Sequence, residues 1–140
     1  MNWLNNLDVV NKLIASIVAV SAFGFLLGRW ATPALALVPQ RALGIFGIHR
    51  LFTHAWLHTG AGHLLGNCLG LYFAGHILRH HLGSDRIFIQ MFAFVLIGGA
   101  AMYAFAFHTR NVAVIGVSGA VYGVISAALF LAPNSDVKFL

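Results

Sequence analysis

The sequence has 140 residues, of which 60% are hydrophobic and 8% are charged. Soluble globular domains carry roughly a quarter charged residues, so this composition excludes that class and indicates a membrane protein. The net charge of +5 is spread along the chain without a basic block, which argues against nucleic-acid binding and fits attraction to anionic lipid headgroups.

Hydrophobic runs predict four transmembrane helices, because a span takes about 20 residues and loops take the rest. We expect the spans near residues 9–29, 63–78, 87–107 and 112–131. The first run is short and reaches spanning length only if Lys12 and Arg29 extend to the membrane surface. A signal peptide ending at the small-x-small site Ala34-Leu35-Ala36 is an alternative for this run, but the remainder is itself membranous.

Residues 33–62 are the longest stretch without a clear span. They include two prolines and four glycines, yet they remain hydrophobic. An apolar loop of this length suits a segment that lies in the membrane interface, or dips into it, and is buried against protein.

Basic residues divide evenly between the two sides of the membrane, so the positive-inside rule gives no orientation. One side receives Lys12, Arg79, Arg86 and Lys138, and the other receives Arg29, Arg41, Arg50 and Arg110. All three acidic residues, Asp8, Asp85 and Asp136, fall on the first side.

Three polar residues near the starts of two spans suggest acyl transfer, which needs a nucleophile, a base and donors for the oxyanion. Ser118, in the run VIGVSGAVYG, can be the nucleophile, and its backbone N–H is one donor. His63 and Asn67 are four residues apart, so they share a helix face and could supply two more. The second and fourth spans start on the same membrane face, which brings these residues to one depth.

Structural roles are the alternative for each of these residues. Ser118 could bond back to a carbonyl one turn earlier, and His63 and Asn67 could bond each other and a loop carbonyl. Glycines spaced four apart predict close helix packing in two of the spans: Gly66 with Gly70, and Gly119 with Gly123.

Metal binding is the competing chemistry, because seven of the eight histidines fall within residues 49–81. A pair such as His54 and His58 can ligate zinc from one helix face. However, the pair lacks the glutamate of HEXXH, residues 9–84 contain no acid, and the single Cys68 forms no CxxC site. We therefore expect no metal.

The block HRLFTHAWLHTGAGHLLGN, preceded by ALALVP and followed by GHILRHHLGS and GVSGAVYG, resembles the rhomboid intramembrane serine proteases. The resemblance runs from the first span to Pro133. The family pattern of Arg, Thr, His-x4-His-x3-Asn and Gly-x-Ser-Gly falls on Arg50, Thr53, His58, His63, Asn67, Gly116, Ser118 and Gly119.

The resemblance implies a six-helix bundle whose active site opens to the side opposite the N-terminus. It assigns Ser118 as the nucleophile and His63, Asn67 and the Ser118 amide as the oxyanion hole. Supporting positions are Gly116, Gly119, Tyr122, His58 and Arg50, with Tyr122 packed beside the catalytic histidine and residues 33–62 as the half-submerged first loop. It implies no cofactor and a transmembrane protein as substrate.

Two departures from the family pattern stand out. The general base would be a histidine on the sixth helix, whereas this chain ends after the fourth span, so we expect a truncated domain that is silent by itself. Arg79 stands where a glutamate is usual, and His49 stands where a tryptophan is usual. These changes keep open an inactive relative that binds transmembrane helices without cutting them.

The sequence thus predicts an all-α polytopic membrane protein, a single rhomboid-like bundle over residues 1–140 with four transmembrane helices. We expect a serine endopeptidase in a bacterial cytoplasmic membrane, with membrane-protein substrates and the lipid bilayer as partners and no nucleic acid. The first alternative is the inactive relative, and the second is a histidine-rich metal-binding membrane protein.

Overall fold

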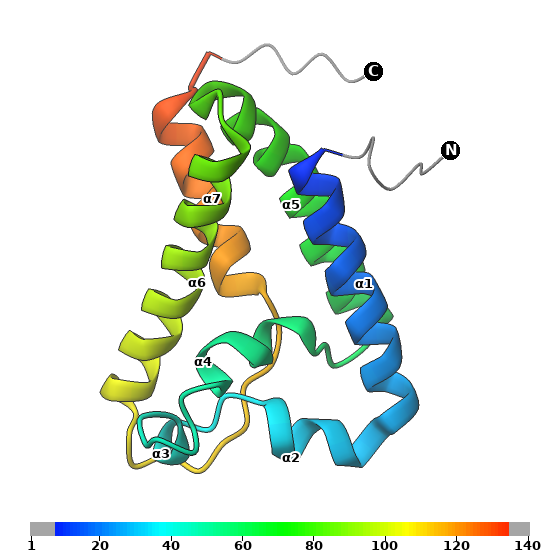
Figure 1. Cartoon of the computed structure of the whole chain (residues 1–140), viewed down its shortest axis with the longest axis vertical. Helices are drawn as coiled ribbons and strands as arrows, with labels where there is room; N and C mark the ends of the chain where they lie inside the picture. Colours follow the sequence, from blue (N-terminus) through cyan, green and yellow to red (C-terminus); the bar gives the residue numbers. More distant parts are fainter. Residues whose placement is uncertain (1–7, 135–140) are drawn as a thin grey trace.

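The computed structural model describes residues 8–134, which form helices joined by turns and extended segments (Figure 1). The predicted all-α class is confirmed, since these residues contain no strand beyond a single bridge between Leu37 and Val114. Asp136 and Lys138, which the sequence assigned to one side of the membrane, lie outside the described residues.

The body of the molecule consists of α1 (Val9–Leu27), α5 (Ala61–Leu82), α6 (Asp85–Ala106) and α7 (Ser118–Leu131). At the top of Figure 1, α1 and α6 begin and α5 and α7 end, and we call this part of the molecule the upper end. At the lower end, α1 and α6 end. The alternation of direction predicted for the spans is therefore observed, and α5 and α7 run the same way.

Short helices connect α1 to α5 across the lower end. They are η2 (Gly28–Trp30), α2 (Ala31–Leu35), α3 (Pro39–Ala42), α4 (Arg50–Thr53) and η3 (His54–Trp56). The chain turns at α2 and α3 and returns through α4 and η3 toward the start of α5 (Figure 1).

The turn between α5 and α6 is fixed by its own residues. Gly83 ends α5 with a left-handed φ of 65°, and the Ser84 side chain accepts from the Ile87 N–H at the start of α6. Arg79 donates from Nε to Asp85 Oδ1 at 2.6 Å. Arg79, which stands where the resemblance leads us to expect a glutamate, thus has a partner and closes this turn.

The fourth helix begins later than the sequence predicts. We expected a span from residue 112, but α7 begins at Ser118, because residues 112–117 are held by the first loop instead of by a helical turn. Leu37 and Val114 exchange two backbone hydrogen bonds of 2.9 and 2.8 Å, and the Gly116 N–H donates to the His54 carbonyl at 2.9 Å. Gly116 adopts a φ of 111°, which favours glycine strongly.

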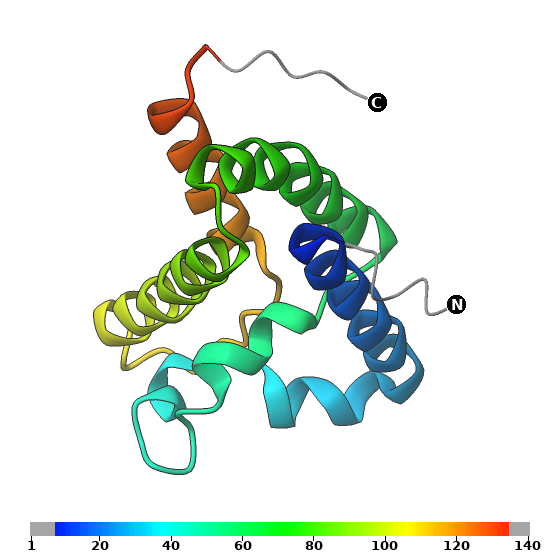
Figure 2. The ribbon, with the colours of Figure 1, turned by 45° about the horizontal axis from the view of Figure 1, so that its top comes forward.

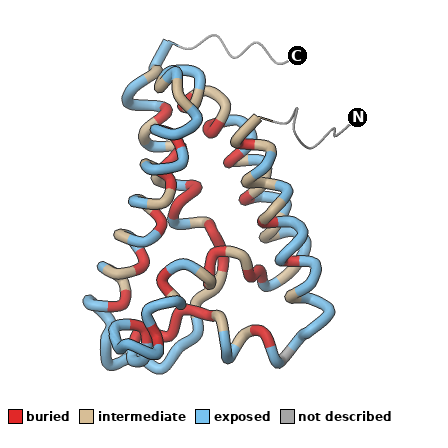
Figure 3. Tube along the Cα trace, in the orientation of Figure 1, coloured by how far each residue is buried: buried red, intermediate tan, exposed pale blue. Residues whose placement is uncertain are grey.

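Two of the four predicted spans, α1 and α6, are long and apolar enough to cross a membrane. The helix α7 is apolar but has 14 residues, and α5 has a basic last turn. Burial follows one side of each helix, with the outward sides exposed (Figure 3). Those outward sides carry large apolar groups such as Phe94, 79% exposed, and Phe130, 84% exposed, as a lipid-facing surface would.

Close packing at glycine is observed at one residue of each predicted pair. A Cβ on Gly70 would lie 2.8 Å from a Val121 methyl group, and one on Gly123 would collide with Val95. These glycines let α5 and α6 approach α7 closely. Gly66 and Gly119 face open space with no such neighbour within 4 Å, so the prediction is wrong for them.

Candidate active site

Ser118 is the first residue of α7, which starts about halfway along the long axis of the molecule (Figure 1). N–H groups in the first turn of a helix have no intrahelical acceptor, and this end of the helix favours negative charge. The suggested bond from Ser118 back to an earlier turn cannot form, because no helical turn precedes it. Its half-buried hydroxyl makes no hydrogen bond within residues 8–134.

His63, in the first turn of α5, lies against the backbone just before Ser118. A Cβ on Gly116 would be 2.7 Å from Cε1 and 2.9 Å from Nε2 of the His63 ring. Glycine is therefore required here for space as well as for its φ angle. The structure brings two predicted site residues, His63 and Gly116, into contact beside the nucleophile candidate.

The Thr59 side chain contacts one ring nitrogen of His63. Its hydroxyl lies 3.1 Å from His63 Nδ1, while Nε2 is the ring nitrogen nearer to Gly116. If the hydroxyl donates to Nδ1, a neutral ring carries its proton on Nε2 and can donate toward the start of α7. We call Thr59, His63, Gly116 and Ser118 the Ser118 cluster. Thr59 was not predicted, although its place four residues before His63 was a usable signal.

His58 is the centre of a buried chain of hydrogen bonds. The Asn67 amide can only donate from Nδ2, so it donates to His58 Nε2 at 3.0 Å. His58 Nδ1 then carries the ring proton and donates to Ser21 Oγ at 2.8 Å. Ser21 Oγ donates in turn to the Trp56 carbonyl at 2.7 Å. This His58 network of Ser21, Trp56, His58 and Asn67 ties α1 and the first loop to α5.

The network requires a neutral His58. Burial, followed by the charge of His63, lowers the pKa of His58 to about 4. The two rings meet edge to face with centroids 4.9 Å apart. The Asn67 amide has two N–H groups, and one remains after the bond to His58. Asn67 is thus oriented by His58, and its role as an oxyanion donor stays a prediction.

Arg50, predicted as a supporting residue, fixes the first loop. Its Nη1 donates to the Ala36 carbonyl at 2.8 Å, and Thr53 Oγ1 donates to the Leu35 carbonyl at 2.8 Å. His49 Nε2 lies 3.0 Å from the Ala34 carbonyl. Residues 34–36 lead directly into the Leu37–Val114 bridge, so these side chains hold the segment that pairs with the approach to Ser118.

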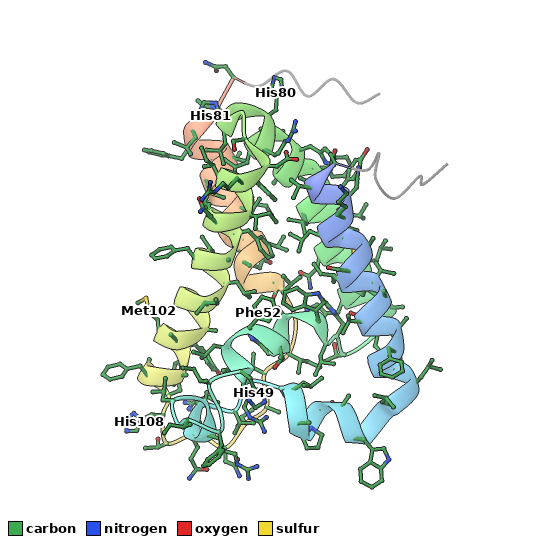
Figure 4. All side chains as sticks on the ribbon, viewed as in Figure 1. His49, Phe52, His80, His81, Met102 and His108 are labelled. Carbon is green, nitrogen blue, oxygen red and sulfur yellow. The ribbon has the colours of Figure 1, made fainter. Side chains whose placement is uncertain are left out.

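The remaining histidines lie away from Ser118 or are engaged elsewhere. His80 and His81 are at the upper end, and His108 is at the lower end (Figure 4). His54 Nδ1 bonds the Arg50 carbonyl, and burial lowers the pKa of its ring. Within residues 8–134, no histidine is hydrogen-bonded to Ser118.

Tyr122 and Gly119 complete the predicted set. Tyr122 is 70% exposed, and its packing beside a catalytic histidine stays a prediction. Gly119 faces open space, so there is room beside the first turn of α7. Across residues 8–134, no three His, Cys, Asp or Glu side chains gather where they could hold a metal ion.

A family model for the Rhomboid domain matches residues 46–140. RHOMBOID-like protein 1 of Arabidopsis thaliana is 36% identical over 83 residues, which cover 59% of this chain and 20% of that protein. Rhomboid protease GluP of Bacillus subtilis (strain 168) is 32% identical over 91 residues, 65% of this chain and 17% of that protein. Inactive RHOMBOID-like protein 8 of Arabidopsis thaliana is 34% identical over 82 residues, which cover 59% of this chain and 22% of that protein. The chain thus spans about a fifth of the length of these curated relatives, and no solved structure matches it significantly.

Proposed function

Because the chain belongs to the rhomboid family, we propose that it forms part of an intramembrane serine endopeptidase. Its substrates are membrane proteins, hydrolysed in or near their transmembrane segments, and Ser118 is the nucleophile. The observation that carries this proposal is the contact of His63 with Gly116 beside the first turn of α7. One of the relatives, Rhomboid protease GluP, is named a protease.

Family membership and the apolar helices α1 and α6 support an integral membrane protein. The relatives come from a plant and a bacterium, so the bacterial cytoplasmic membrane stays a prediction. Since α7 begins halfway along the molecule, Ser118 would meet its substrate below the membrane surface.

In the proposed reaction, Ser118 Oγ attacks the carbonyl carbon of the scissile peptide bond. The carbonyl oxygen becomes an oxyanion, and three donors would bind it: the Ser118 N–H, His63 Nε2–H and the second N–H of Asn67. Each belongs to a group that is already held in place, which is the condition for such donors to lower the barrier. The helix N-terminus adds favourable electrostatics for the same charge.

The Ser118 proton needs a base within hydrogen-bond reach, about 2.6–3.2 Å. The resemblance places this base, a histidine, on a sixth helix. We propose that it comes from outside residues 1–140, so that these residues alone are catalytically inactive. The leaving amine would take its proton from the same group.

A second candidate is an inactive rhomboid-like protein that binds transmembrane helices without cutting them. The similarity to Inactive RHOMBOID-like protein 8, 34% over 82 residues, favours it. Such a protein would keep the His58 network, which stabilises the fold. The residues of the Ser118 cluster would not need to be catalytically competent.

Cleavage of a model transmembrane substrate by the gene's longest product, reconstituted in lipid, tests the proposal. We expect cleavage by the wild type and none by Ser118→Ala. Ser126→Ala, on the exposed face of the same helix, is the matched control and should cut normally. Cleavage by Ser118→Ala at the wild-type rate would overturn the assignment. A wild type that never cuts, yet co-purifies with membrane helices, would favour the inactive relative.

A serine-directed fluorophosphonate tests the base separately. We expect Ser118-dependent labelling of the longer product and not of residues 1–140. Equal labelling of both would show that a base lies within these residues.

A further inference from the structure

The loop between α3 and α4 presents an exposed apolar tip. Ile45 is 89% exposed, Phe46 95% and Ile48 61%. The turn is closed by bonds of 2.8 and 3.0 Å from the N–H groups of Gly47 and Ile48 to the Gly44 carbonyl. In Figure 2 this loop stands out from the rest of the ribbon at the lower left. The backbone of the turn therefore holds these side chains outward.

A hollow of about 400 Å³ lies at the base of this tip. Its lining is Arg41, Gly44, Ile45, Phe46, Gly47 and Arg50. Within residues 8–134, Arg50 makes one side-chain hydrogen bond, from Nη1 to the Ala36 carbonyl, which leaves other guanidinium N–H groups unused. The exposed Arg41 guanidinium makes no hydrogen bond or ion pair within residues 8–134. Two arginines thus border one hollow with donors to spare.

No carboxylate of the described chain is near enough to neutralise them. Asp8 and Asp85, the two acids within residues 8–134, pair with His76 and Arg79 through contacts of 2.7 and 2.6 Å. Both pairs are at the upper end, where α1 and α6 begin (Figure 1). The hollow at the lower end is consequently cationic and open to an anion.

The position of the hollow favours a lipid as the source of that anion. The helices α1 and α6 end at the lower end, so the headgroups of a membrane that they cross lie at this level. Trp30, 72% exposed at the end of α1, belongs to the residue type that concentrates at such interfaces. The exposed apolar tip suits the acyl chains of a phospholipid, and the two arginines beside it suit its phosphate.

We propose that the hollow between Arg41 and Arg50 binds the phosphate of an anionic phospholipid, while Ile45 and Phe46 contact its acyl chains. Guanidinium groups bind phosphate oxygens through paired, charge-assisted hydrogen bonds. The net negative charge of phosphatidylglycerol distinguishes it from phosphatidylcholine, whose phosphate is offset by choline. Binding at this site does not depend on the chemistry of Ser118.

Native mass spectrometry of the protein in a neutral detergent, titrated with dioctanoyl phosphatidylglycerol, tests the proposal. We expect one saturable adduct that is tighter than that of dioctanoyl phosphatidylcholine. Arg41→Gln should weaken phosphatidylglycerol binding about fivefold, the effect of one arginine near an anionic surface, and Arg41→Lys should restore most of it. Arg110→Gln is the matched control, because Arg110 stacks on Phe107 at 4.9 Å and does not line the hollow.

Three results would overturn the proposal. Equal binding of the two lipids would show that charge is not recognised. An unchanged affinity in Arg41→Gln would place the lipid elsewhere. Full displacement of phosphatidylglycerol by millimolar inorganic phosphate would identify a free-anion site instead of a lipid site.

Discussion

The His58 network and the Ser118 cluster are neighbours, yet they use the same kind of side chain in opposite ways. Both ring nitrogens of His58 are engaged, with Asn67 and Ser21 at 3.0 and 2.8 Å, and the ring is buried. His63, whose ring is 4.9 Å away, bonds Thr59 through one nitrogen and presents the other to Gly116. A saturated, buried histidine stabilises the fold, whereas one with a spare nitrogen at a helix N-terminus is available for chemistry.

Asn67 is a member of the His58 network and a proposed oxyanion donor, so its loss should have the largest effect. We expect Asn67→Ala to lower turnover by the longest gene product roughly 100-fold, because an oxyanion donor is removed. It should also destabilise the protein by about 1–3 kcal/mol, since His58 Nε2 is left without a partner. Leu65→Ala, on the exposed side of α5, is the control. Wild-type turnover in a destabilised Asn67→Ala protein would confine Asn67 to the His58 network.

The second prediction separates the regions. We expect His58→Ala to cost about 2–3 kcal/mol of unfolding free energy in detergent, because buried groups of Ser21 and Asn67 lose their partner. Turnover of the protein that remains folded should fall less than in Asn67→Ala. An equal catalytic loss with stability unchanged would assign His58 to the reaction.

Much of this arrangement could be predicted from the sequence. The spacing predicted that His63 lies at the depth of Ser118, and the contact of His63 with Gly116 and the direction of the spans agree. The place of Asn67 beside Ser118 stays a prediction. The start of α7 could not be predicted, because VAVIGV has the hydropathy of a helix and is extended only through its bonds to the first loop. Ser21 was missed for a similar reason: its partner His58 is 37 residues away along the chain.

Acid should affect the His58 network first. The pKa of His58 is about 4 in the folded protein, lowered by burial and by His63, against about 6.5 when unfolded. Between these values the unfolded chain binds more protons, so stability should fall as the pH is lowered from about 6.5 to about 4. The thermal midpoint in detergent measures this. His58→Gln should flatten the curve, leaving the part due to His54, whose pKa burial also lowers. An identical curve in the variant would refute the assignment.

Ser21→Ala should have a smaller effect on the same network. The change removes the acceptor of the His58 Nδ1–H and the donor to the Trp56 carbonyl, so two hydrogen bonds are lost. We expect a loss of about 1–2 kcal/mol in unfolding free energy, with turnover of the folded fraction nearly unchanged. Ser21→Thr, which retains the hydroxyl, tests whether the hydrogen bonds are responsible. Equal losses in both variants would point to packing instead.

The smallest expected effect lies in the Ser118 cluster, at Thr59. Thr59→Val keeps the volume but removes the hydroxyl beside His63 Nδ1, so the ring no longer has a preferred nitrogen for its proton. One neutral hydrogen bond is worth about 0.5–1.5 kcal/mol, which corresponds to a loss of roughly two- to tenfold in kcat. KM and the thermal midpoint should change little, because Thr59 is exposed and its one printed side-chain hydrogen bond is the contact with His63. Thr59→Ser should restore the rate, since its hydroxyl can donate to the same nitrogen. A serine variant as slow as the valine variant would show that the Thr59 hydroxyl does not orient His63, and the division between the two regions would then rest on His58 alone.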